Sequence, residues 1–67
     1  MIRIFIVAGI RLYREGIAQL LGRQSGMTVV GAESDLRGAV AGIQRLEPDV
    51  VVLDMAMGET HTAVRDL

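Results

Sequence analysis

The sequence lacks several residue types, and each absence excludes a class of protein. It has no cysteine, which rules out disulfides, thiolate metal sites and thiol nucleophiles. It has no lysine, and its seven basic residues are scattered arginines in a chain whose net charge is −1. This charge balance argues against a nucleic-acid-binding surface. Only 3% of the residues are aromatic, so the core must be aliphatic.

Long hydrophobic runs are also missing. The apolar N-terminus, "MIRIFIVAG", is too short to span a bilayer, and no small-residue cleavage site closes it. We therefore expect a cytoplasmic protein that makes no membrane contact. The 67 residues allow one domain (1–67), and a chain of this size buries only about 60% of its unfolded surface.

Three stretches rich in β-favouring residues predict strands. They are residues 2–7, 27–32 and 49–53. The third is apolar at almost every position, which is typical of a parallel strand covered on both faces. Two helices are predicted between these strands, so the pattern is that of an α/β fold with right-handed crossovers. Strand one should lie in the middle, which gives the order 2-1-3.

The two helices are predicted from apolar residues with helical spacing. In residues 11–24 the apolar face is Tyr13, Ile17, Leu20 and Leu21, and in the second helix it is Leu36, Val40, Ile43 and Leu46. Gly26 is placed to stop the first helix, and either Ser34 or Asp35 can cap the second. A third helix is expected to begin in "HTAVRDL" (61–67).

One carboxylate stands at the end of the apolar third strand, in "EPDVVVLDMAM". This is Asp54, and Ala8 and Gly9 end the first strand beside it. In a parallel sheet of this kind the carboxyl ends of the strands form the ligand crevice, so Asp54 is expected at its rim. The simplest interpretation of Asp54 is a solvated strand-end acid without a task.

The order and spacing of several segments resemble the receiver domain of two-component response regulators, nearest to the branch with a LuxR-type output. The segments are "IRIFIV", "RLYREGIAQLL", "MTVVGAESD", "AVAGIQRLEPDVVVLDMAM" and "AVRDL". The resemblance implies a flavodoxin-like sheet in which Asp54 matches the aspartate that accepts a phosphoryl group from a histidine kinase.

The sequence differs from the receiver family at the positions that form the family's metal-binding pocket. Where the family has an acidic pair after strand one, this sequence has Ala8 and Gly9. The backbone carbonyl of Ala56 matches a family metal ligand but cannot replace two charges. Mg²⁺ requires oxygen ligands, so its binding is expected to be weak or absent. The chain is also expected not to be an enzyme. We expect a degenerate receiver that signals by protein–protein interaction or regulates a transcriptional output.

The family's fourth and fifth strands have no counterpart in the sequence, which predicts a partial receiver, the N-terminal half of the domain. Strand three would then expose an apolar edge, and such an edge is a template for pairing with another chain. We therefore expect a homodimer or a higher oligomer.

The sequence offers two other candidate sites. Glu33, at the end of strand two, could bind a ribose in a nucleotide- or dinucleotide-binding βαβ unit, but "VAGIRLYREG" supplies one glycine where that motif needs three. His61 with Glu59 and Asp54 could suggest a metal site, although a single histidine in a polar loop is usually solvated.

Overall fold

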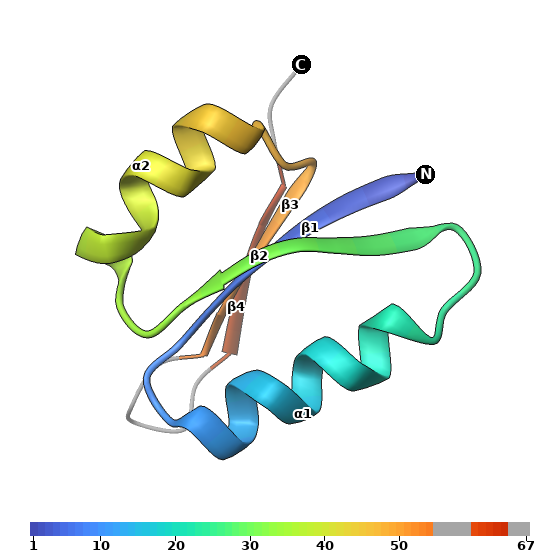
Figure 1. The fold of residues 1–67 in the computed structure, drawn as a ribbon, viewed down its shortest axis with the longest axis horizontal. Helices are drawn as coiled ribbons and strands as arrows, with labels where there is room; N and C mark the ends of the chain where they lie inside the picture. Colours follow the sequence, from blue (N-terminus) through green and yellow to red (C-terminus); the bar gives the residue numbers. More distant parts are fainter. Residues whose placement is uncertain (55–59, 65–67) are drawn as a thin grey trace.

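The chain folds as a sheet with one helix on each face (Figure 1). The computed structural model describes residues 1–54 and the backbone of residues 60–64. The elements are β1 (Ile2–Ala8), α1 (Arg11–Gly22), β2 (Met27–Glu33), α2 (Leu36–Leu46), β3 (Val50–Asp54) and β4 (Thr60–Val64). Strand β1 pairs in parallel with both β2 and β3, which confirms the α/β fold and the order 2-1-3.

The predicted start of a third helix is wrong. Thr60–Val64 forms β4, which is antiparallel to β3 and extends the sheet to the order β2-β1-β3-β4. The β-branched residues of this segment favour a strand, and pairing satisfies the backbone groups along the outer edge of β3. The open strand-three edge on which we based the expected oligomer is therefore covered within this chain.

Two apolar clusters lie on opposite faces of the sheet, and alternation along β1 separates them. The buried residues of the first are Ile4, Ile6 and Ala8, against which α1 packs Ile17, Ala18 and Leu21. The buried residues of the second are Phe5, Val7 and Ala39, against which α2 packs Ile43 and Leu46. The core is therefore centred on β1, between the two helices.

Half of each predicted helical face lies outside the core. Tyr13 and Leu20 on α1 are 53% and 63% exposed, and Leu36 and Val40 on α2 are 55% and 46% exposed. In the described part of the chain both helices pack on β1 and β2, and no Cα atom of either helix lies within 8 Å of a Cα atom of β3. Two strands form a narrow platform, so a helix can bury only its central apolar stripe against them.

The ends of the helices are set by local contacts. Asp35 rather than Ser34 caps α2, because its Oδ1 accepts a hydrogen bond from the Gly38 N–H at 2.6 Å. Helix α1 ends at Gly22, before the predicted position. Gly26 instead turns the chain into β2 with a φ of +83°, a conformation that glycine adopts without strain. Neither described helix has the length and hydropathy that crossing a membrane would require.

Strand β2 contains a bulge opposite the middle of β1. Ile4 pairs with Val29, whereas Phe5 pairs with Gly31, so Val30 is an extra residue in the ladder. The Phe5 ring lies directly over Gly31, where an added Cβ would be 2.5 Å from Phe5 Cε2. Glycine is required at this position because the aromatic ring approaches the backbone so closely.

Candidate functional site

The carboxyl ends of β1 and β3 lie side by side, so Asp54 lies next to the end of β1, as the sequence predicts. Asp54 is the last residue of β3, and its Cα pairs with Ala8 of β1 on one side and Thr60 of β4 on the other. Ala8 is fully buried, and Asp54 is half-buried. The carboxylate therefore stands at the rim of the core.

A hollow of about 310 Å³ opens at this end of the sheet. Its lining residues are Val7, Gly9, Ser34, Asp35, Leu36, Leu53 and Asp54. The wall is made by the ends of β1 and β3 and by the start of α2. Asp35 and Asp54 are its acidic residues, and Asp35 already accepts the hydrogen bond that caps α2.

The residues at this edge do not fit a magnesium site of the receiver type. Mg²⁺ needs oxygen ligands in near-octahedral geometry, whereas Ala8 offers a methyl group and Gly9 offers no side chain. Among the described residues no group of three or more His, Cys, Asp or Glu side chains could hold a metal ion. Ala56, whose carbonyl was a predicted ligand by resemblance, lies outside the described residues.

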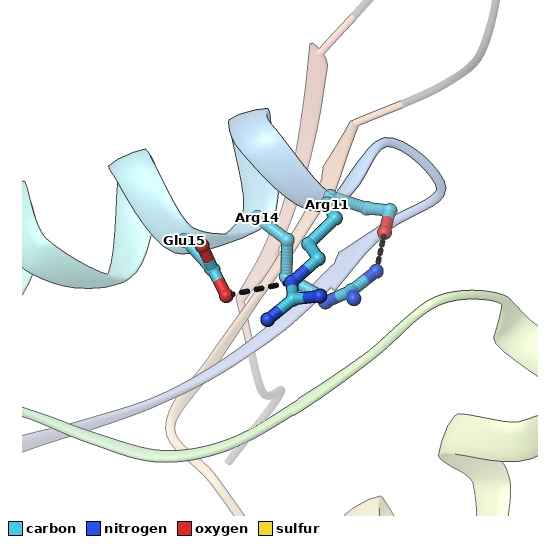
Figure 2. Close-up of polar contacts among 4 residues, drawn as sticks. Arg11, Arg14 and Glu15 are labelled. Carbon is cyan, nitrogen blue, oxygen red and sulfur yellow. Dashed lines mark hydrogen bonds and ion pairs between the residues drawn. The ribbon is translucent and has the colours of Figure 1, made fainter.

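A cation of the chain itself reaches the end of β1. Arg14 Nη1 donates a hydrogen bond to the Ala8 carbonyl at 2.9 Å, and Figure 2 shows the arginine reaching there from the first turns of α1. Sequence reasoning missed this contact. A signal was present, because helical side chains lean toward the helix N-terminus, and α1 begins just after β1 ends.

The neighbouring Arg11 has a different environment. Its Nε forms an ion pair with Glu15 Oε1 at 2.9 Å, and the two side chains are 80% and 58% exposed (Figure 2). The hydrogen bond and the negative charge of Glu15 raise the pKa of Arg11 above its ordinary value. This is a solvated pair on the helix surface, of the kind that contributes little to stability.

The two alternative sites gain no support from the described residues. Glu33 is the last residue of β2, as predicted, but it does not line the hollow at the ends of β1 and β3. The backbone of His61 pairs with Leu53 in the antiparallel ladder, and Glu59 lies outside the described residues.

Comparison with known proteins gives partial matches. No protein-family model matches the chain, and no solved structure gives a significant match. Protein-glutamate methylesterase/protein-glutamine glutaminase 2 of Xanthomonas oryzae pv. oryzae is 38% identical over 56 residues, which cover 84% of this chain and 16% of that protein. The corresponding enzyme of Alkalilimnicola ehrlichii is 35% identical over 68 residues, covering 98% of the chain and 17% of that protein.

A response regulator is among the relatives. An uncharacterized response regulatory protein of Yersinia pestis is 39% identical over 57 residues, which cover 85% of this chain and 24% of that protein. The chain thus spans only 16–24% of the length of these three relatives. Together with the parallel β2-β1-β3 sheet, the similarities support a receiver-type domain of the kind found in response regulators.

Proposed function

We propose that the chain acts as a receiver-like signalling module in a two-component phosphorelay and has no enzymatic activity of its own. The observation that carries this proposal is the position of Asp54, at the end of β3 and paired with Ala8 of the central strand. The receiver resemblance assigns the phospho-acceptor to this position. Similarity to a response regulatory protein supports the same interpretation.

We also propose that Asp54 is phosphorylated poorly. Transfer of a phosphoryl group to a carboxylate concentrates negative charge, and receivers neutralise that charge with a divalent cation. Ala8 and Gly9 supply no carboxylates to hold the cation. The module would then signal through protein–protein contacts that do not depend on a stable acyl phosphate.

The partners follow from this function. We propose a histidine kinase or another two-component protein as the binding partner, and a transcriptional output of the LuxR type as the process regulated, all in the cytoplasm. The net charge of −1 argues against a nucleic-acid-binding surface on this chain itself.

Binding to a histidine kinase tests the proposal. Purified kinase from the same genome, loaded with radioactive phosphate, would be mixed with the chain and with an Asp54→Asn variant. We expect both proteins to bind the kinase with similar affinity and the unaltered chain to acquire little label. Thermal stabilisation by ATP or NAD without any kinase binding would instead support a nucleotide-binding βαβ unit and overturn the proposal.

We further propose that the chain associates with a second copy. The outer edge of β3 is covered by β4, so this proposal rests on the two faces of β3. No Cα atom of either described helix lies within 8 Å of a Cα atom of β3, and residues 50–53 are only half-buried. Apolar surface of this kind favours association. Sedimentation at micromolar concentrations should detect dimers or larger species, which Val51→Lys should reduce. A cooperatively folded monomer over that range would contradict self-association.

A further inference from the structure

The hollow at the carboxyl edge of the sheet combines apolar walls with negative charge. We propose that it binds a small organic cation, an ammonium group carried on a short apolar body, with the ammonium paired to Asp54 and the body against Val7 and Leu53. Asp54 is shared with the proposed function, but this binding requires neither phosphorylation nor a partner protein.

The hollow has the size of a small-ligand site. Its volume is about 310 Å³, and ligand pockets range from about 300 to 1,000 Å³. A cavity of about 150 Å³ already holds benzene, so one ring with a short polar arm can be accommodated. The hollow also lies at the carboxyl ends of β1 and β3, where open parallel sheets bind their ligands.

Three aliphatic side chains line the hollow. Val7, near the end of β1, is buried, and half-buried Leu53 of β3 packs with it in the cluster on the α2 face. Leu36, the first residue of α2, is 55% exposed and lines the same hollow. The apolar body of a ligand would remove this surface from water, and that removal favours binding.

The charge of the hollow favours a cation. Its described lining residues include two acids, Asp35 and Asp54, and no arginine. Within residues 1–54, neither the side-chain hydrogen bonds nor the ion pair involve the Asp54 carboxylate. This half-buried carboxylate is therefore available to a ligand, and a hydrogen bond between charged groups is stronger where apolar surface excludes water.

An anionic ligand is disfavoured at the same place, although a helix begins there. Helix N-termini attract anions, but Asp35 Oδ1 already accepts a hydrogen bond from the Gly38 N–H of α2 at 2.6 Å. A carboxylate of the chain itself thus occupies the position that an anion would take. An incoming anion would also be repelled by Asp54.

Three probes with the same ring distinguish the effect of charge from that of the apolar body. Phenethylamine is protonated at neutral pH, phenethyl alcohol is neutral and hydrocinnamate is an anion. Each would be titrated into the isotope-labelled chain while the backbone amide shifts are followed by NMR. We expect phenethylamine to bind with a Kd of about 1 mM and to shift the amides of Gly9, Ser34 and Leu36.

The alcohol should bind about tenfold more weakly than the amine, because it lacks the charge that pairs with Asp54, and hydrocinnamate should not bind measurably. Equal affinities for the amine and the alcohol would overturn the proposal. Shifts confined to residues outside the hollow would overturn it as well.

An acid-to-amide pair of variants tests the role of Asp54. Asp54→Asn removes the charge with little change of shape, and it should bring the affinities for the amine and the alcohol within about twofold of each other. Glu15→Gln is the matched control, because it removes a charge from an exposed position on α1, outside the hollow, and it should leave the tenfold difference intact. An undiminished preference for the amine in Asp54→Asn would contradict the proposal.

A second pair of variants tests the position of the ligand. A Cβ added at Gly9 would lie 3.6 Å from the Ser34 carbonyl oxygen, so Gly9→Val places its side chain between two residues that line the hollow. Gly16→Val is the control, since nothing lies within 4 Å of its added Cβ. Phenethylamine should bind about tenfold more weakly to Gly9→Val alone. Unchanged binding would place the ligand elsewhere and overturn the proposal. These titrations contain no kinase and no phosphoryl donor, so their failure is distinguishable from failure of the proposed function.

Discussion

Arg3 and Asp49 join the beginnings of β1 and β3 by two opposed hydrogen bonds. The Arg3 backbone N–H donates to Asp49 Oδ2 at 2.9 Å, and the Asp49 backbone N–H donates to the Arg3 carbonyl at 2.8 Å. The Arg3 side chain also donates from Nη1 to the Glu47 carbonyl at 3.2 Å. These bonds attach the connection between α2 and β3 to the central strand, at the end of the sheet opposite Asp54.

Removing the Asp49 side chain should therefore destabilise the chain. We expect Asp49→Ala to lower the free energy of unfolding by about 1 kcal/mol, because the partly buried Arg3 N–H loses its acceptor. Asp49→Asn keeps an acceptor oxygen and should lose less. Urea denaturation of the three proteins checks this order, and an equal loss in both variants would show that the bond itself contributes little.

The contact between Phe5 and Gly31 predicts a steric effect. Gly31→Ala would place a Cβ 2.5 Å from a buried ring, and we expect a loss of about 1–3 kcal/mol in unfolding free energy. Gly16→Ala on α1 is the control: nothing lies within 4 Å of its added Cβ, and it should stabilise the chain by about 0.5–1 kcal/mol. Phe5→Leu should reduce the loss caused by Gly31→Ala, and failure to do so would mean that the ring is not the obstacle.

The sequence allows either Ser34 or Asp35 to cap α2, and in the structure Asp35 forms the cap. Asp35→Ala should cost about 1 kcal/mol of stability, because the Gly38 N–H loses its partner. Ser34→Ala should be close to neutral, and Asp35→Ser should restore most of the loss. Thermal unfolding followed by circular dichroism distinguishes the variants. A larger effect at Ser34 than at Asp35 would contradict the observed cap.

Phosphorylation and metal binding at the carboxyl edge are expected to be weak. After incubation with acetyl phosphate and Mg²⁺, intact-mass measurement should show little or no phosphorylated chain, since Ala8 and Gly9 supply no charge to hold the cation. A clear mass increase that disappears in Asp54→Asn would contradict this. Tight Mg²⁺ binding by the unaltered chain in calorimetry would be equally incompatible with it.

The parallel part of the fold could be predicted because local and global signals agree. Residues 4–7 and 50–53 combine β-branched residues with continuous apolar character, which is typical of strands covered on both faces. Parallel strands bring their carboxyl ends together. The topology alone therefore predicts that Ala8 and Gly9 lie near Asp54.

The features that the sequence did not predict depend on contacts between distant residues. Thr60–Val64 has a mixed pattern, and its pairing with β3 made it a strand. Leu20 and Val40 are exposed because each helix packs on only two strands. Helical spacing in the sequence does not indicate how many strands a helix covers. Arg14 was overlooked because a long flexible side chain has many possible partners until the end of β1 is placed beside it.

The bulge at Val30 has a consequence for insertions and deletions. Strand β2 carries one residue more than β1 needs, while β1 and β3 pair without a shift. Deletion of Val30 would leave Ile4 opposite Val29 and Phe5 opposite Gly31 in an uninterrupted ladder. Deletion of a residue from β3 would instead shift its register against both of its neighbours, β1 and β4. Length variation among related chains is therefore expected to be tolerated in β2 and selected against in β3.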